Sequence, residues 1–589
     1  MEIVLVLLIL LMAVVLFASE WLPIDLTSLL ILLALATTGL VSVEEAFSGF
    51  SNPAVITVAA MFIISAGISH TGAMSRVGER MIRLASDSES RLVAVIMATV
   101  ALFSAFINNI GATAVLMPVV TGIARKLNTS PSKLLMPLAF GSLLGGVCTL
   151  IGTPPNILMN ALLQQYSGES FAMFDFAPIG LVIAVSGILY MVLVGRKLLP
   201  VRKAGKLTEE YQVKEYITEV EILAKSPIIG QTIARSRLTQ DFNLKIRAII
   251  RGQQKIPQPH GNSKLREGDV LFLEGNPEGI LKVMKAKGLE LIPERDNPPP
   301  KKDTEEMVVV EASLTTNSDL VGRTLSQVSF HESHGLNVLA LWRQGAPVVR
   351  QVDRVILKFG DVLLLQGPLK RVLHLGRGHG FLLLGGVPPV PYRPRRAPLA
   401  LFILVMVILL AAFGGLPIML AASLGAAFMV LARCLTVQEA YESVDWRIIL
   451  LIAGTLPLGL AMENSGAAQL ISEQVLRVVG PFGPWVVLAA FFLLTSMLTE
   501  LMSHAATAVL IAPIAYHAAL ELGVDPKPFF MAVAIAASSC FMTPVSHQSN
   551  ALVMGPGGYR FFDYTRVGAP LNLLIWIFGS LLIPLLFPF

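Results

Sequence analysis

The sequence predicts a polytopic α-helical membrane protein that consists of two inverted repeats, with a soluble α+β insertion between them. Of its 589 residues, 54% are hydrophobic and only 14% are charged, and the mean hydropathy is +0.68. This composition is typical of integral membrane proteins. Apolar stretches recur between residues 3 and 199 and again between 399 and 589. Polar interruptions appear in the same order in both halves, which predicts the repeat.

Each half is expected to contain five transmembrane helices and one re-entrant hairpin. About 20 apolar residues cross a bilayer, so most of the apolar stretches are single crossings. The stretches 92–122 and 484–519 are longer than one span and have polar residues in the middle. A hairpin suits them better, because bare backbone at that depth must lie within protein or beside water. We expect membrane repeat 1 at 1–200 and membrane repeat 2 at 397–589.

Basic residues predict the orientation of the two halves. The net charge is +5, and arginines and lysines cluster in short loops beside apolar stretches, which favours a role in topology over nucleic-acid binding. Such clusters flank the first hairpin at 76–91 and 125–133, and others bracket the polar gap at 196–206 and 393–396. Cytoplasmic loops are enriched in these residues. All four clusters are therefore expected in the cytoplasm, which inverts the second half relative to the first.

The polar gap is itself a duplication. Residues 228–283 parallel residues 320–375, and in each copy a Gly-Asp turn signal precedes a short alternating run, VLFLEG or VLLLQG. Such runs after a tight turn are typical of strands. We expect two small α+β modules at 207–295 and 303–385, joined by the proline-rich linker DNPPPKKD.

This duplicated pattern resembles the TrkA-C (RCK C-terminal) domain, which implies a regulatory module that binds a small molecule. A potassium channel is not indicated, because no carbonyl filter of the TVGYG kind occurs. The run GRGHG at 376–380 has the wrong spacing for dinucleotide binding, and no P-loop of an ATP-driven pump is present. Transport must then be driven by an ion gradient or proceed without an energy source.

Two polar interruptions in each half predict where a binding site lies. Residues 107–118 read INNIGATAVLMP and residues 502–513 read MSHAATAVLIAP. A second interruption follows each of them, IGTPPN at 151–156 and MTPVSHQSN at 542–550. Interrupted helices in corresponding positions of two halves are typical of secondary transporters, which bind their substrates between them. We expect the site where the four interruptions converge.

The residue types at these interruptions suit an anion together with a hard cation. Hairpin tips present backbone N–H groups at helix N-termini, which bind anions, and neutral hydroxyl and amide groups release an anion more readily than an arginine clamp does. Carbonyls freed by prolines, with Ser and Asn oxygens, suit sodium. The alternative is that the interruptions are ordinary helix ends. The candidate substrate- and ion-binding residues are Ser104, Asn108, Asn109, Gly111, Thr113, Gly152, Thr153, Pro154, Asn156, Thr499, Ser503, His504, Thr507, Thr543, Pro544, Ser546 and Asn550.

The second hairpin tip differs from the first. Judged by the spacing to the helix proline, His504 takes the place of Asn109. Ionisable residues within the membrane are functional hypotheses by default, and histidine titrates near neutral pH. Glu500, His504 and His547 are therefore candidates for carrying a proton in place of a sodium ion. The alternative is that His504 is a neutral imidazole that hydrogen-bonds within the hairpin.

The hairpins with their IGTPPN and MTP…N interruptions are similar to those of the divalent anion:sodium symporter (DASS) family over nearly the whole membrane portion. The two inserted modules and the tail TPVSHQSNALVMGPGGYRFFDYTRVGAP at 543–570 resemble its SAC1-like sulfate permease branch. The resemblance implies that the hairpin tips hold an anion and sodium, that a transport domain moves like an elevator, and that a scaffold domain dimerises. Ile110 and Ala505 stand where the family has a threonine. These two differences concern the second sodium site and the contacts to a substrate of the carboxylate type.

We therefore expect a secondary active transporter, not an enzyme, that imports sulfate or a related divalent oxyanion with sodium. The alternatives are a proton-coupled or dicarboxylate transporter of the same family, and an anion sensor that does not transport. No cofactor and no metal beyond the transported sodium is expected. The expected partners are membrane lipid and a second copy of the chain, with no nucleic acid. The expected location is a bacterial inner membrane, with the modules in the cytoplasm.

Overall fold

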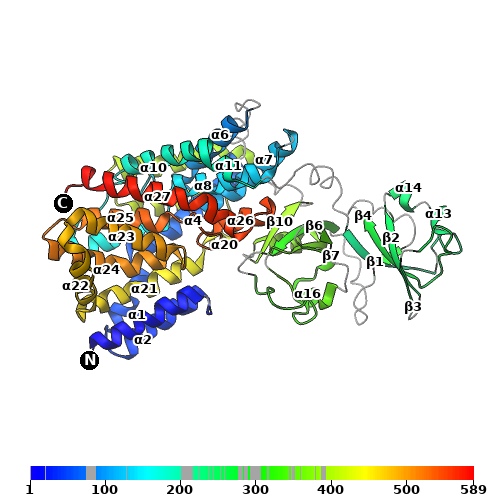
Figure 1. Cartoon of the computed structure of the whole chain (residues 1–589), viewed down its shortest axis with the longest axis horizontal. Helices are drawn as coiled ribbons and strands as arrows, with labels where there is room; N and C mark the ends of the chain where they lie inside the picture. Colours follow the sequence, from blue (N-terminus) through cyan, green and yellow to red (C-terminus); the bar gives the residue numbers. More distant parts are fainter. Residues whose placement is uncertain are drawn as a thin grey trace. The chain divides into compact units, whose positions relative to one another are not determined.

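A computed structural model shows the chain as two compact units, one formed by Met1–Arg202 with Pro391–Phe589 and the other by Lys203–Val390 (Figure 1). The basic residues at 76–83 and 202–206 and the linker at 296–303 lie outside the described residues. The structure describes residues 2–19, 21–74, 88–127, 129–200, 216–224, 226–236, 238–242, 244–251, 254–257, 259–275, 283, 289–291, 307–314, 318–343, 346–347, 352–358, 360–377, 380–385 and 393–589.

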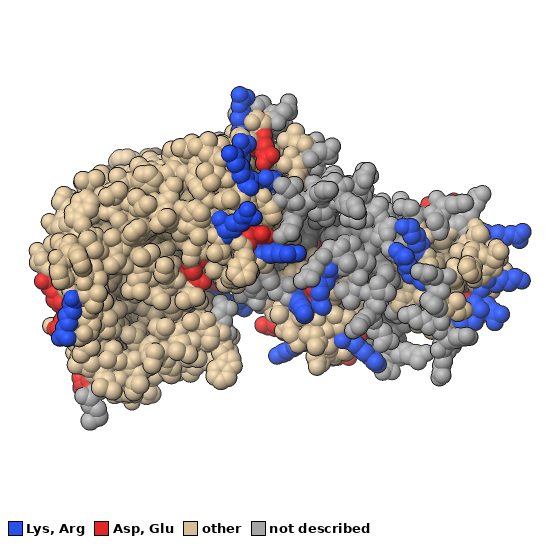
Figure 2. Space-filling model, viewed as in Figure 1, with Lys and Arg blue, Asp and Glu red and all other residues tan. Residues whose placement is uncertain are grey.

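The first unit is helical, and its helices are of the membrane type. On the face seen in Figure 2, charged side chains are sparse over these helices. Among the described residues, seven helical spans are long and apolar enough to cross a membrane: Glu2–Ser19, Val43–Thr71, Ala177–Leu198, Pro394–Ala412, Trp446–Asn464, His504–Leu522 and Phe561–Leu586. These spans confirm the expectation of a polytopic helical membrane protein.

The helices follow one another in a similar order in the two halves. In the first half they are α1 (Glu2–Ser19), α2 (Ile24–Thr37), α3 (Val43–Ser48), α4 (Pro53–Thr71), α6 (Glu89–Ser104), α7 (Asn109–Lys126), α8 (Leu135–Gly146), α9 (Pro154–Ser167) and α10 (Ala177–Tyr190), which continues to α11 (Arg196–Leu198). In the second half they are α18 (Ala397–Ala412), α19 (Ile418–Leu431), α20 (Val437–Ser443), α21 (Trp446–Asn464), α22 (Ala467–Val479), α23 (Pro484–Thr499), α24 (His504–Leu522), α25 (Lys527–Ser538), α26 (Gln548–Gly557) and α27 (Phe561–Leu586).

Local chemistry repeats with this order. A capping box starts α3, where Ser42 and Glu45 bond to each other's backbone N–H groups, and the same box at Thr436 and Glu439 starts α20. Such boxes satisfy N–H groups that have no partner within the helix. The amphipathic helix α22 was not predicted from the sequence. The opposite orientation of the two halves in a membrane stays a prediction.

Both predicted hairpins consist of two helices with a short break between them. The break at 105–108 separates α6 from α7, and the break at 500–503 separates α23 from α24. The helices of each pair pack against each other. Further breaks, at 147–153 and 539–547, separate α8 from α9 and α25 from α26. The helices extend a few residues beyond the predicted limits of the hairpins, to residues 89, 126 and 522.

Among the described residues, the second unit contains two antiparallel sheets of five strands each. Their strand orders are β3-β2-β4-β1-β5 and β10-β6-β9-β7-β8, which match when the second is read backwards. The strands are β1 (Tyr216–Ile222), β2 (Lys245–Arg251), β3 (Gln254–Pro257), β4 (Val270–Gly275), β5 (Leu289–Leu291), β6 (Met307–Leu314), β7 (Asn337–Arg343), β8 (Ala346–Pro347), β9 (Val362–Pro368) and β10 (Phe381–Gly385).

Each module contains the same kind of hydrogen-bonded Arg–Asp pair. Arg251 donates to both carboxylate oxygens of Asp269 at 2.8 and 2.7 Å, and Arg343 donates to those of Asp361 at 2.7 and 2.6 Å. Both aspartates are 1% exposed, and the glycine before each has a positive φ, of 74° or 80°. The equal separation of 18 residues in each pair shows two copies of one fold. Their assignment as TrkA-C domains stays a prediction.

Candidate functional site

The first hairpin tip is held by short polar side chains that bond to one another. Ser104 Oγ donates to Asn109 Oδ1 over 2.6 Å, across the break between α6 and α7. Thr113 Oγ1 donates to the carbonyl of Asn109 at 2.8 Å, and a 3.0 Å bond joins it to Ser142 Oγ of α8. Asn108 Oδ1 accepts the backbone N–H of Ile110 in the first turn of α7. The tip is therefore tied to both helices of the hairpin and to α8.

The break between α8 and α9 lies against this tip. Thr149 Oγ1 donates to the carbonyl of Ala105, at the end of α6. Asn156 Nδ2 donates to the carbonyl of Thr149 at 2.8 Å, and within the described part of the chain its Oδ1 is buried without a hydrogen-bond partner. Thr153 and Pro154 begin α9, and no side chain caps it. One buried amide oxygen thus stays available at the start of α9, where the first two residues are prolines without an N–H group.

Two glycines let the backbone approach this region closely. A Cβ on Gly146 would lie 2.5 Å from Asn109 Oδ1, and one on Gly152 would lie 2.4 Å from the carbonyl oxygen of Gly146. Real Cβ atoms do not approach so closely, so any larger residue would displace the tip or the break. Gly111 is less confined, because its Cβ would meet Ser65 Oγ at 3.3 Å.

The second hairpin tip uses the same residue types differently. Ser503 Oγ accepts the backbone N–H three residues later at 3.3 Å and caps α24. Thr507 Oγ1 donates to the carbonyl of Ser503 at 3.2 Å. Thr499 Oγ1, in contrast to Ser104, donates to a carbonyl one turn earlier in its own helix at 2.9 Å. Its hydroxyl proton is therefore used within α23 and does not tie the tip across the break.

The break between α25 and α26 contains a counterpart of Asn156. Asn550 Nδ2 donates to the carbonyls of Cys540 and Thr543 at 2.9 and 3.3 Å, and its buried Oδ1 has no hydrogen-bond partner among the described residues. Ser546 Oγ donates to the carbonyl of Thr543 at 2.9 Å, and Pro544 is buried in the same break. Both halves therefore place an asparagine at a break, with its amide nitrogen bonded and its amide oxygen free.

Glu500 joins the second tip to the second break. Its Oε1 accepts the N–H of Met542 at 2.9 Å and Nδ2 of Asn572 at 3.0 Å, and its backbone carbonyl accepts Thr543 Oγ1 at 3.3 Å. Its Oε2 is buried without a partner in the described part of the chain. Asn572 lies in α27 and was missed by sequence reasoning, although a lone amide within an apolar helix is a usable signal. Glu500 therefore holds the second tip, the second break and α27 together through hydrogen bonds.

The two predicted histidines lie together. The ring centroids of His504 and His547 are 5.1 Å apart, with the planes at 31°. His547 Nδ1 accepts the N–H of Ser549 at 3.1 Å and caps α26, so the neutral ring carries its proton on Nε2. His504 is the first residue of α24. A helix N-terminus disfavours a cation, so this geometry suits neutral N–H donors.

Helices from the two halves pack against each other around the breaks. The second-half helix α26 packs on α7 and α8, and the first-half helix α9 packs on α24 and α25. Tyrosines add hydrogen bonds between the halves. Tyr559 Oη donates to the carbonyl of Ser132 at 2.6 Å and accepts the N–H of Met136 at 2.8 Å. The breaks of both halves therefore belong to one helical body.

A resident metal centre is not indicated by these side chains. Within the described ranges, no group of three or more His, Cys, Asp or Glu residues could hold a metal ion. Among the described residues, the buried oxygens without a partner at the breaks include the amide oxygens of Asn156 and Asn550 and Oε2 of Glu500. Oxygens of this kind suit a hard monovalent cation, and the N–H groups of helix N-termini suit an anion.

Comparison with known proteins assigns the chain to a family. A family model described as a citrate transporter, CitMHS, matches residues 14–536. The chain belongs to this citrate transporter family. The match covers both hairpins and the soluble unit, and it ends within α25. Citrate transporter family membership identifies the chain as a membrane transporter of the secondary type, while the narrower resemblance to the sulfate permease branch stays a prediction.

Several relatives of this citrate transporter family member align along almost the whole chain. An uncharacterized transporter of Synechocystis is 38% identical over 586 residues, covering 98% of this chain and 95% of the relative. One of Escherichia coli is 34% identical over 616 residues and covers 100% of both chains. A protein of Chlamydomonas reinhardtii named a sulfur deprivation response regulator is 31% identical over 551 residues, or 91% and 93% of the two chains.

Proposed function

We propose that this transporter imports sulfate or a related divalent oxyanion together with sodium. The observation that carries the proposal is the matched pair of buried asparagines at the helix breaks, Asn156 and Asn550, whose amide oxygens have no hydrogen-bond partner among the described residues. More distant relatives support the substrate class. A protein of Chlamydomonas reinhardtii named a sodium/sulfate cotransporter is 22% identical over 97% of this chain.

The anion would be bound by neutral groups. The helices α7, α24 and α26 begin at the breaks, and helix N-termini offer N–H groups and a partial positive charge to an anion. The helix α9 also begins at a break, but its first two residues are prolines, so it offers the partial positive charge without N–H groups from those residues. The proposed site residues include no lysine or arginine, so binding is weak enough for release. The N–H groups of His504 and His547 would add donors on the side of the second repeat.

Sodium would be bound by oxygens and would supply the driving force. The free amide oxygens of Asn156 and Asn550 and the backbone carbonyls at the breaks are hard ligands of the kind that sodium prefers. An inward-negative potential opposes entry of a dianion by roughly 4.6 kcal/mol per 100 mV, twice the value for one charge. Two co-transported cations cancel this opposition, and a third makes uptake favourable.

We further propose that the transport domain moves like an elevator. The chain would act as a homodimer in a bacterial inner membrane. The two modules would regulate transport from the cytoplasm as TrkA-C domains. The duplicated Arg251–Asp269 and Arg343–Asp361 networks support two modules of one kind. No enzymatic activity is proposed. Sodium is the coupling ion, and no cofactor is required.

One alternative is a transporter of the same family with another substrate or coupling ion. A protein of Staphylococcus saprophyticus named a sodium-dependent dicarboxylate transporter is 30% identical over 150 residues, or 26% of this chain. Proton coupling is disfavoured by the capping bond of His547, because protonation of Nδ1 would remove the acceptor of the Ser549 N–H.

A second alternative is an anion sensor that does not transport. The relative named a sulfur deprivation response regulator aligns over 91% of this chain, and a receptor could keep the same site without moving it. Radiolabelled sulfate uptake into proteoliposomes under a sodium gradient tests the proposal, with unlabelled succinate, citrate and thiosulfate as competitors. Inhibition by thiosulfate alone supports a sulfate-type site; inhibition by succinate or citrate supports a carboxylate site, and absence of uptake supports the sensor.

A further inference from the structure

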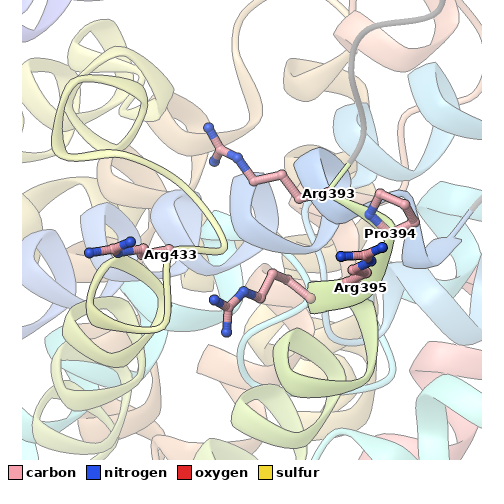
Figure 3. A pocket seen from close by; sticks show the side chains of 5 residues that line it. Arg393, Pro394, Arg395 and Arg433 are labelled. Carbon is pink, nitrogen blue, oxygen red and sulfur yellow. The ribbon is translucent and has the colours of Figure 1, made fainter.

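A pocket of about 380 Å³ lies where α18 begins and α19 ends, far along the chain from the helix breaks. Figure 3 shows that its side chains come from the segment that leads into α18 and from the turn after α19. These two helices pack against each other and are joined by a short connection, so the pocket lies at one end of the pair. The residues that line it are Arg393, Pro394, Arg395, Arg396 and Arg433.

Among the described residues, Arg393 is the one of the four arginines that has an acidic partner. Arg393 donates to both oxygens of Glu439 at 2.7 and 3.0 Å and to the carbonyl of Cys434 at 3.0 Å. Burial raises the pKa of Glu439, but the hydrogen bonds from Arg393 and from the backbone of Thr436 bring it down to about 2. Glu439 therefore stays ionised and balances Arg393.

The other three arginines face the pocket without an acidic partner in the described part of the chain. Arg395, Arg396 and Arg433 are all exposed. Guanidinium groups that line one pocket repel one another and are stabilised by an anion that they share. The pocket thus carries an uncompensated positive charge.

The backbone of Arg433 adds a second observation. Its φ is +55°, and it lies two residues after Leu431, the last residue of α19. A left-handed residue after a helix end is usually glycine, because a side chain there is strained. Arginine at this position is therefore unfavourable for the turn, yet it contributes a guanidinium group to the pocket.

Exposed apolar side chains lie on the elements that carry or follow the arginines. Leu431 is 74% exposed and Val437 is 57% exposed, on either side of Arg433 in the sequence, and Phe402 of α18 is 60% exposed. On helices of the membrane type, such side chains face lipid. The cationic pocket therefore lies at the end of helices that present apolar side chains to their surroundings.

We propose that this arginine pocket binds the phosphate of an anionic phospholipid, with the acyl chains along the neighbouring apolar side chains. Guanidinium groups bind phosphate oxygens through paired N–H bonds, and basic pockets between membrane helices suit anionic headgroups. Free phosphate shares the headgroup chemistry but makes no use of the apolar surroundings. Arg393 also donates its backbone N–H to the carbonyl of His70 at 3.0 Å, at the end of α4, so a bound lipid would stabilise α4, α18 and α19 together.

The test follows the unfolding temperature of the purified full chain while phosphatidylglycerol or phosphatidylcholine is titrated into detergent micelles. The variants are Arg433→Gly and the double variant Arg395→Gln/Arg396→Gln, and Arg477→Gln is the control, because Arg477 is exposed in the last turn of α22. Glycine removes the left-handed strain, so Arg433→Gly is expected to fold at least as well as the wild type. A parallel titration compares sodium phosphate with sodium chloride at equal ionic strength.

We expect phosphatidylglycerol, but not phosphatidylcholine, to stabilise the wild type and the Arg477→Gln control. The apparent affinity for phosphatidylglycerol is expected to fall about fivefold for each pocket arginine that is lost. This factor corresponds to the contribution of one cationic side chain to binding at an anionic membrane surface. Equal affinity in Arg433→Gly and the wild type would overturn the proposal. Equal stabilisation by sodium phosphate alone would overturn the lipid as the source of the phosphate.

Discussion

Replacement of Gly146 by alanine tests the first hairpin tip with a single methyl group. The new Cβ would lie 2.5 Å from Oδ1 and 2.9 Å from Nδ2 of Asn109, where ordinary contact begins at 3.4 Å. The amide would have to move, which breaks its 2.6 Å bond to Ser104. Overpacking of a tight site costs about 1–3 kcal/mol. If that cost falls on the bound state, apparent affinity falls by about 5- to 150-fold.

The assay measures sulfate uptake into proteoliposomes at increasing concentrations of sodium and of sulfate. Gly122→Ala in α7 is the matched control, because nothing lies within 4 Å of a Cβ at that position. We expect the control to transport like the wild type and Gly146→Ala to need more sodium or more sulfate. Unchanged concentration dependence of a folded Gly146→Ala variant would refute the placement of Asn109 in the binding site.

Two further predictions concern the second tip and the soluble unit. In His504→Gln the amide N–H replaces the N–H of a neutral imidazole. Sulfate uptake is therefore expected to stay within about fivefold of the wild type between about pH 6 and 8. Loss of a response to a proton gradient in this variant would instead indicate that His504 carries a proton. Asp361→Asn breaks the buried pair with Arg343 and is expected to destabilise β9 by about 2–3 kcal/mol, since Arg343 is partly exposed. Hydrogen exchange of β9 amides in the full chain measures this, with the exposed Asp319→Asn as control, and unchanged exchange would contradict it.

The helix breaks could be predicted because their causes are local. Polar residues and prolines interrupt apolar stretches at 107–109, 153–155 and 543–547, and backbone at these positions cannot continue a helix without loss of hydrogen bonds. The Gly-Asp turns of the two modules were visible for the same reason, since the left-handed glycine is a local requirement. Elements with local causes are therefore the part of the fold that the sequence predicts.

The contacts between the halves could not be predicted in this way. The bond between Met136 and Tyr559 joins residues 423 positions apart, and no spacing pattern reports such a pair. The different use of Ser104 and Thr499 was also hidden, because both are hydroxyl residues at the same position of a hairpin. Only the structure shows that one bonds across the break and the other along its own helix.

The most direct test of sodium-coupled oxyanion import is sulfate accumulation in proteoliposomes under an inward sodium gradient with an inside-negative potential. The account predicts accumulation above the external concentration, which disappears when the sodium gradient is removed and is not restored by a proton gradient. Sulfate accumulation driven by the proton gradient alone, or no accumulation under either gradient, would contradict it.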